Sequence, residues 1–120
     1  MPIAARWRRL EVLPPARGRD AQPGVYELAD EEKQVVYIGQ SAKDVPNRIR
    51  QHLAGRRGEA SCVASRAVYW RYRYARVPQA EEAALLKTYG ERFGALPPCN
   101  RASPRARDAV RRYLERTRSD

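Results

Sequence analysis

The chain has 120 residues, with 24 Lys and Arg against 14 Asp and Glu, which gives a formal net charge of +10 and a pI of about 10.3. This length suits one domain, and no segment approaches the roughly 18 consecutive apolar residues that a transmembrane helix needs. Only three of the basic residues are lysines, so arginine, whose planar side chain suits phosphate, dominates the charge. The partners compatible with this charge are DNA, RNA, an anionic lipid or an acidic protein.

The amino terminus has no apolar run after its first charges, so we expect no secretory signal and a cytoplasmic location. The chain contains two cysteines, Cys62 and Cys99, and one histidine, His52. These are too few for a disulfide framework, and a zinc site built on them would need a carboxylate as its fourth ligand. We therefore expect two reduced thiols, as is usual in a reducing compartment.

The chain reads as a single domain, residues 1–120, in three parts. An arginine-rich arm over residues 1–21 precedes a core over residues 22–100. A basic helix that begins near Ser103 and belongs to residues 101–120 follows the core. No segment repeats and none has low complexity, so the core must contain the fold and the site.

The core begins with two short β-rich segments, residues 25–28 and 35–38, separated by the polar residues 30–33. This pattern predicts a β-hairpin. A turn centred in the middle of the polar segment would place Tyr26 opposite Tyr37, with both rings on one face of the hairpin.

Asp44 is a good N-cap for a helix that runs to about residue 53. Arg48 and His52, four residues apart, lie along the edge of its apolar stripe. The stripe itself, with one apolar residue at every fourth position, consists of Val45, Ile49 and Leu53.

Residues 54–65 predict a mobile basic loop, and residues 68–77 predict a third strand. Alternation along this strand separates an aromatic face from a basic face. We interpret the aromatic face as part of the core rather than as a surface on which bases stack. The aromatic face carries Trp70, Tyr72 and Tyr74, and the opposite face carries Arg71 and Arg73.

A second helix is predicted over residues 78–93. At about 100° per residue its apolar face is centred on Glu82, with Glu81 at the border. A carboxylate directed at a protein core costs several kcal/mol unless a cation, hydrogen bonds or solvent compensate it. We therefore single out Glu82 as a functional candidate, although an ion pair with Arg48 or Arg71 would also explain its position.

Six polar side chains from separate predicted elements supply the groups that phosphodiester hydrolysis requires. A carboxylate can hold a divalent cation, an arginine can stabilise charge on phosphoryl oxygens, and a phenol or imidazole can accept a proton from water. The six candidates are Tyr26, Tyr37, Arg48, His52, Glu82 and Asn100.

The order of these residues is distinctive: Gly24-Val25-Tyr26, Tyr37-Ile38-Gly39, Arg48 with His52, Glu82 on a helix, and Asn100 after Pro97-Pro98-Cys99. Over roughly residues 22–100 this order resembles the GIY-YIG nuclease family. The resemblance implies an α/β domain of the α+β type, with a three-stranded antiparallel sheet flanked by helices in the order ββαβα and an extra C-terminal helix. It also implies metal-dependent cleavage of nucleic acid.

The resemblance further implies a role for each candidate. The two motif tyrosines would position or deprotonate the attacking water, and His52 would assist the base. Arg48 would contact the scissile phosphate, and Asn100 would close and brace the site. Glu82 would be the sole protein ligand of a single Mg²⁺ or Mn²⁺ ion. Which of the phenols or the imidazole is the general base stays open.

Two classes of function remain. The first is an endonuclease acting on DNA, single-stranded or branched DNA included, with RNA left open. The second is a non-catalytic, basic nucleic-acid-binding module that keeps the nuclease fold. An acid facing a polyanion favours the nuclease. We expect no membrane partner, and target choice that is loose, structure-dependent or supplied by a protein partner. The residues expected to bind the nucleic-acid backbone are Lys43, Arg50, Arg56, Arg57, Arg71 and Arg73.

Overall fold

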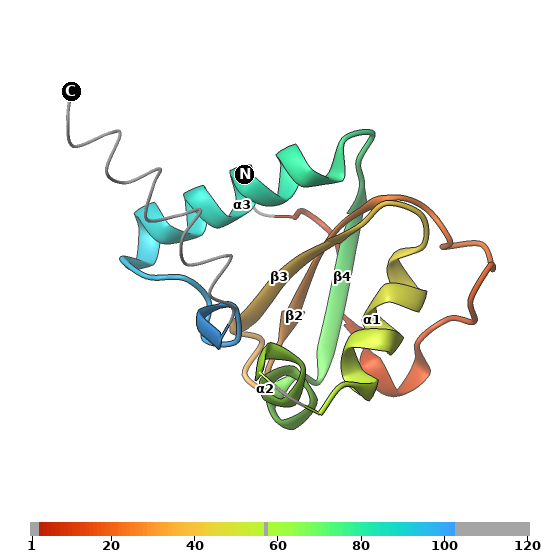
Figure 1. Ribbon diagram of the computed structural model, residues 1–120, viewed down its shortest axis with the longest axis horizontal. Helices are drawn as coiled ribbons and strands as arrows, with labels where there is room; N and C mark the ends of the chain where they lie inside the picture. The colour runs from red at the N-terminus through yellow and green to blue at the C-terminus, as the bar shows by residue number, and fades with distance from the viewer. Residues whose placement is uncertain (1–2, 57, 103–120) are drawn as a thin grey trace.

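The structure is a computed structural model that describes residues 3–56 and 58–102, so the predicted C-terminal helix lies outside it. Within these residues the fold is α+β, with one antiparallel sheet in the strand order β1-β4-β2-β3 and three α-helices (Figure 1). No helix in this part of the chain is long and apolar enough to cross a membrane. The elements are β1 (Arg8–Arg9), η1 (Leu10–Val12), β2 (Gly24–Ala29), β3 (Val35–Ser41), α1 (Val45–Ala54), α2 (Gly58–Arg66), β4 (Tyr69–Tyr74), α3 (Pro78–Phe93) and η2 (Asn100–Ala102).

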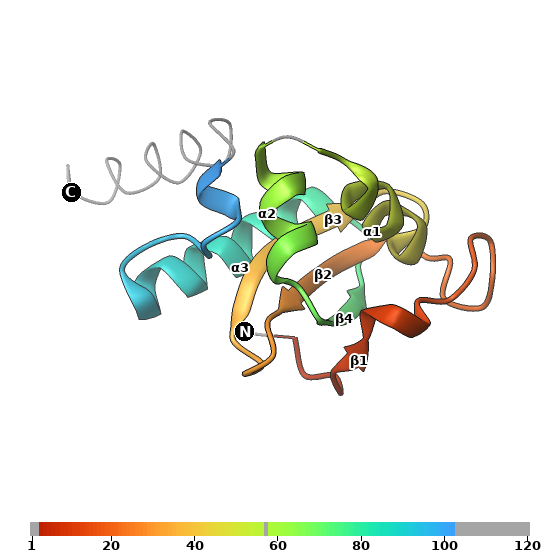
Figure 2. The same ribbon diagram turned by 90° about the horizontal axis from the view of Figure 1, so that it is seen from below.

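Two hydrophobic clusters cover the two faces of the sheet. Helices α1 and α2 lie side by side over one face, as Figure 2 shows, and α3 contributes to the cluster on the other. Successive residues of a strand point to opposite faces, so neighbours such as Val25 and Tyr26 belong to different clusters. The first cluster includes Tyr26, Leu28, Ile49, Val63 and Trp70, and the second includes Val25, Ile38, Leu85 and Leu86.

The predicted hairpin forms, but its register differs from the prediction by two residues. Tyr26 lies opposite Gly39, and Tyr37 lies opposite Leu28, with an irregularity after Leu28. The turn begins at Asp30, whose carboxylate accepts hydrogen bonds from the amides of residues 32 and 34, and residue 33 adopts a left-handed φ of 62°. This longer turn shifts the pairing, so the two tyrosines share a face as diagonal neighbours rather than as a direct pair.

A fourth strand corrects the predicted three-stranded sheet. The two-residue strand β1 pairs with β4, Arg8 with Trp70 and Arg9 with the residue before it. The sequence did not predict β1, because its two arginines show no alternating pattern and it pairs with β4 through backbone groups. The segment expected to be a basic arm packs on the core from Ile3 onward, since the Ile3 side chain is 2% exposed.

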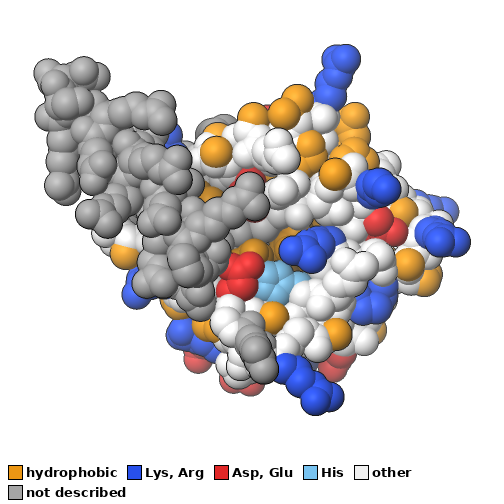
Figure 3. All heavy atoms as spheres, viewed as in Figure 1, with side chains coloured by type: hydrophobic (Ala, Val, Ile, Leu, Met, Phe, Trp, Pro, Cys, Tyr) orange, Lys and Arg blue, Asp and Glu red, His pale blue; other side chains and the backbone are white. Residues whose placement is uncertain are grey.

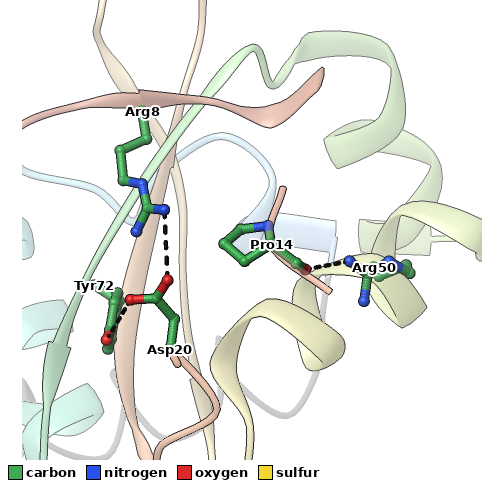
Figure 4. Close-up of polar contacts among 5 residues, drawn as sticks. All are labelled: Arg8, Pro14, Asp20, Arg50 and Tyr72. Carbon is green, nitrogen blue, oxygen red and sulfur yellow. Dashed lines mark hydrogen bonds and ion pairs between the residues drawn. The ribbon is translucent and has the colours of Figure 1, made fainter. Parts of the chain in front are cut away.

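Polar contacts also hold this amino-terminal segment in place (Figure 4). The Asp20 carboxylate accepts a hydrogen bond from the Tyr72 hydroxyl at 3.1 Å and faces the Arg8 guanidinium at 3.5 Å. The Arg50 guanidinium, on α1, donates to the backbone carbonyl of Pro14. The segment is therefore bound both to β4 and to α1.

The prediction of a mobile loop over residues 54–65 is wrong, because much of that segment is helix α2. The prediction of two reduced thiols is wrong as well: Cys62 on α2 and Cys99 before η2 form a disulfide with a Cα–Cα distance of 5.4 Å. Helix α2 is short and mostly small and polar, and Val63 is its one buried residue within the structure described. The sequence of α2 carries only a weak helical pattern, because the burial of Val63 and the disulfide stabilise the helix rather than local propensity.

The other predicted elements form close to where the sequence places them. Helix α1 begins after Asp44, whose carboxylate accepts a hydrogen bond from the Asn47 amide at 3.1 Å, and α3 spans residues 78–93 as predicted. Strand β4 ends early, at Tyr74, because its partner β2 begins at Gly24. Of the aromatic face predicted as core, Trp70 is buried, but Tyr74 is 57% exposed.

Candidate active site

Two buried tyrosines from neighbouring strands form the centre of the candidate site. Tyr26 on β2 and Tyr37 on β3 are almost fully buried, and their ring centroids lie 6.1 Å apart. Gly39 makes this possible, since a Cβ at that position would come within 2.5 Å of the Tyr26 hydroxyl and 2.7 Å of the Tyr37 ring. The packing of the tyrosines therefore requires a glycine at position 39, and its φ is not positive.

Burial is the main reason that the pKa of both phenols lies above the usual value of 10. The Arg48 guanidinium opposes this increase at Tyr26, while the carboxylates of Glu82 and Glu59 add to it. For Tyr37 the negative charges of Glu59 and Glu82 likewise raise the pKa. Both phenols therefore carry their protons at neutral pH and act there as neutral hydrogen-bonding groups.

Helix α1 brings Arg48 and His52 to the same place. Arg48 is exposed, while His52 is 5% exposed and meets the Tyr37 ring edge-on, with ring centroids 4.6 Å apart. Figure 3 shows the histidine, pale blue, between basic and acidic side chains on the face covered by α1 and α2. The four-residue spacing on α1 places one cation at the surface and one imidazole beneath it.

The imidazole of His52 is buried without a good hydrogen bond. In the described part of the chain neither ring nitrogen has a partner, although the backbone of Glu59 approaches the ring. Burial lowers the pKa of His52 below 6.5 and the Arg48 charge lowers it further, while the Glu59 carboxylate opposes both. The imidazole is therefore neutral at pH 7 and can accept a hydrogen bond or a proton.

Helix α3 carries the candidate metal ligand, Glu82. Glu82 is partly buried, and its charge acts on both tyrosines. Its neighbour Glu81 instead forms an ion pair with Arg73 at 2.8 Å. The helical position that the sequence singled out thus lies among the site residues, although Glu82 is less buried than Leu85 and Leu86 on the same helix.

Asn100 joins the group from the other edge of β3. Its side-chain oxygen accepts a hydrogen bond from the Ile38 amide at 2.9 Å, and its side-chain nitrogen donates to the Ile38 carbonyl at 3.0 Å. The Cys99 amide donates to Val36 in the same way. Asn100 therefore acts on the backbone beside Tyr37 and braces the strand that carries it.

Sequence reasoning missed one side chain that touches the site. Glu59, in the first turn of α2, accepts a hydrogen bond from the Tyr37 hydroxyl at 3.1 Å. The error in assigning residues 54–65 to a loop hid this residue. The only usable signal was an acid at the start of a short, unrecognised helix, a position that the helix dipole favours.

A second missed carboxylate lies on the opposite face. Glu27 on β2 is 3% exposed and pairs with the Arg71 guanidinium at 2.7 Å, which also stacks on the Trp7 ring at 3.9 Å from its centroid. Glu27 is more deeply buried than the glutamate that the sequence singled out. A strand with two buried faces contains no polar stripe in which such a residue would stand out.

The residues expected to bind a nucleic-acid backbone occupy different environments. Lys43 and Arg56 are exposed, and Arg57 lies outside the described residues. Three others are engaged within the protein: Arg50 with the Pro14 carbonyl (Figure 4), Arg71 with Glu27 and Arg73 with Glu81.

A family model described as the GIY-YIG catalytic domain matches residues 22–91. This match covers more than half of the chain, and the chain belongs to the GIY-YIG family, a class of nuclease catalytic domains. No curated protein matched the sequence. The matched region runs from β2 through most of α3 and includes every candidate except Asn100.

Nucleases of this family generally use divalent metal ions. Among the described residues no group of three or more His, Cys, Asp and Glu side chains is placed to hold a metal. One carboxylate is enough for Mg²⁺, which binds through one or two carboxylates and keeps water and substrate phosphate as its other ligands. Glu82, partly buried beside the two tyrosines, fits that requirement.

Proposed function

We propose that the protein is a metal-dependent endonuclease that hydrolyses phosphodiester bonds in DNA. The observation that carries this proposal is the gathering of an exposed arginine, a neutral buried histidine and an acid around two buried phenols, from α1, α3, β2 and β3. A module that only binds DNA gains nothing from a carboxylate at this place, because the carboxylate repels the polyanion.

Arg48 binds the scissile phosphate in this proposal. Its side chain is exposed at the surface above His52, and its charge acts on the buried Tyr26 hydroxyl. A guanidinium held here stabilises the charge that grows on the phosphoryl oxygens during attack, an effect typically worth about 3 kcal/mol for one well-placed donor.

Glu82 would hold the Mg²⁺ or Mn²⁺ ion, which when bound polarises the phosphate and stabilises the leaving oxygen. The protonated phenols of Tyr26 and Tyr37 hold the attacking water by hydrogen bonds. His52 remains neutral because it is buried beside Arg48, so its lone pair can accept a hydrogen bond from the same water. Asn100 keeps β3, and therefore Tyr37, in place.

The excess of arginine and the net charge of +10 support a nucleic-acid substrate for such a nuclease. Exposed cations such as Lys43 and Arg56 bind phosphates without reading sequence, and their binding weakens as salt rises. We propose DNA as the substrate and target choice that is loose, structure-dependent or supplied by a partner protein.

The test uses supercoiled plasmid together with labelled single-stranded, duplex and flap DNA and a matching RNA strand, each with Mg²⁺, with Mn²⁺ or with EDTA. We expect metal-dependent cuts by the wild type, and a loss of about 10³-fold or more in Glu82→Ala, since a metal contributes several kcal/mol. Glu91→Gln, at an exposed position of α3, removes the same charge and should cut normally.

Failure of the wild type to cut any of these substrates beyond the Glu82→Ala protein would leave the non-catalytic binding module as the function. Salt-dependent binding to the same oligonucleotides, measured by fluorescence anisotropy, would then be its remaining activity. Cleavage of RNA in preference to DNA would overturn the choice of substrate, and cuts at one defined duplex sequence would contradict loose targeting.

A further inference from the structure

The Tyr37 hydroxyl makes a hydrogen bond that ties it to helix α2. Its oxygen lies 3.1 Å from the Glu59 carboxylate. A carboxylate of an ionised glutamate can only accept, so the phenol is the donor. Tyr37 has a single hydroxyl proton, and that proton points at Glu59.

This direction determines what Tyr37 can do for a water molecule in the site. Because the phenol donates its one hydrogen to Glu59, its oxygen can only accept further hydrogen bonds. A water that binds to it must therefore donate a proton, which turns the lone pairs of that water away from Tyr37 and toward the substrate. The same contact offers the proton a route from water to phenol and from phenol to carboxylate.

Neither His52 nor Asn100 offers this route in the described structure. His52 meets the tyrosine ring by its edge, and neither of its nitrogens is hydrogen-bonded to a group in the described structure. The side-chain oxygen and nitrogen of Asn100 bond to the Ile38 backbone and not to Tyr37. Glu59 is thus the acceptor that the structure joins directly to a motif tyrosine.

Helix α2 is well fixed, so the position of Glu59 is not accidental. Val63, one turn further along, is completely buried in the same cluster as Tyr37, and Cys62 is joined to Cys99. At the start of the helix, Gly55 and Ala60 are so close that a Cβ on the glycine would lie 2.5 Å from the alanine side chain. These contacts anchor α2 on both sides of Glu59.

We propose that Glu59 is a positioning residue that acts through Tyr37: it orients the attacking water and takes the proton that this water loses. The inference rests on the proposed nuclease function. As the water oxygen uses an electron pair to bond to phosphorus, its O–H bond breaks and the proton passes to Tyr37, whose own proton passes to Glu59. The bond from phosphorus to the leaving sugar oxygen breaks with its electron pair, and that oxygen takes a proton from solvent. Protonated Glu59 later returns its proton to solvent.

Glu59→Gln is the sharpest test. Glutamine has the same size and its side-chain oxygen still accepts the Tyr37 hydrogen bond, so the fold and α2 remain, but it does not take a proton at this pH. We expect kcat on plasmid or labelled DNA to fall by about 10²-fold or more, the usual contribution of a general base. The KM should stay constant or fall, because one negative charge near the polyanion is lost. Glu91→Gln is the matched control for that charge.

Two further measurements separate this role from a merely structural one. In Glu59→Ala, added formate should restore part of kcat, since it can occupy the space and accept the proton. Combining Tyr37→Phe with Glu59→Gln should cost little more than Tyr37→Phe alone, because the two groups act as one unit.

Each outcome has a definite meaning. If the wild type cuts but Glu59→Gln cuts equally well, the inference is wrong and the proposed function stands. If Glu59→Gln melts at a lower temperature and loses activity only in proportion to the folded fraction, Glu59 has a structural role alone. If the wild type does not cut at all, the proposed function has failed first.

Discussion

The two faces of the sheet differ in how completely their buried polar groups are paired. On the face covered by α3, Glu27 and Arg71 form a nearly buried ion pair, and Arg73 pairs with Glu81. On the face covered by α1 and α2, the Tyr37 hydroxyl is bonded to Glu59, but the buried ring nitrogens of His52 and Trp70 have no hydrogen-bond partner in the described structure. Buried polar atoms are nearly always paired, so an exception needs a reason, and a catalytic role is a common one.

The comparison shows that the most deeply buried carboxylate is not one of those near the motif tyrosines. Glu27 is the more deeply buried carboxylate, yet a cation already satisfies it. Glu82 and Glu59 are less buried, and both act on the motif tyrosines. Depth of burial by itself therefore does not distinguish the carboxylates on the two faces of the sheet. Four experiments test this contrast.

The largest effect is expected at the closed ion pair. Glu27→Ala leaves the Arg71 guanidinium without its carboxylate at a side chain that is 17% exposed. Breaking a buried pair on one side typically costs about 4 kcal/mol of stability. Urea unfolding followed by circular dichroism measures the loss, while cleavage per folded molecule should remain normal.

The exposed pair on the same face is the control. Glu81→Ala breaks a contact of similar length whose side chains are 37% and 45% exposed, and such pairs contribute about 1 kcal/mol or less. Equal losses for Glu27→Ala and Glu81→Ala would contradict the idea that burial makes the first pair structural.

Loss of the disulfide should cost somewhat less stability than Glu27→Ala. It closes a loop with a sequence separation of 37, and removing such a link typically costs about 3 kcal/mol. We expect the urea midpoint to fall when a dithiol reductant is added, and a Cys62→Ala/Cys99→Ala protein to show the lower midpoint with or without reductant. A wild-type midpoint that is insensitive to reductant, with two titratable thiols in the native protein, would show that the link is absent.

On the chemical face, His52→Gln should slow cleavage by about 10²-fold, the lower range for a group that assists proton transfer, and should cost less stability than Glu27→Ala. The substitution loses the edge contact with the Tyr37 ring, but neither imidazole nitrogen has a hydrogen-bond partner among the described residues to lose. Thermal melts and single-turnover kinetics check the two halves of this prediction. A large loss of stability with normal kinetics would place His52 among the structural groups.

The smallest effect is a dependence of stability on pH. Burial and the Arg48 charge lower the pKa of folded His52, so below about pH 6.5 the unfolded chain binds a proton that the folded chain excludes. The free energy of unfolding should therefore be greatest above that pH and decrease as pH falls through it. Comparing wild type with His52→Gln at each pH isolates this part, because the substitution removes the group; identical slopes would contradict it.

Much of the fold followed from local patterns. The boundaries of α1 and α3 were predictable because a capping aspartate, prolines in the first turn and apolar residues at helical spacing act within a few residues of one another. The hairpin was recognisable from two β-rich segments, but its register depended on the Asp30 turn. Strand β1 and helix α2 were missed because contacts with distant residues stabilise them.

The amino-acid sequence by itself indicated the family of this protein and, from residue 24 to residue 93, every strand and helix except α2. Those features depend on motif order and helical periodicity, which are properties of short stretches of chain. Only the tertiary structure decided which charges pair with one another, that Cys62 meets Cys99, and that Glu59 accepts the proton of Tyr37. Such contacts join residues that are 22 to 44 positions apart, and no local pattern specifies them because the folding of the whole sheet brings the partners together.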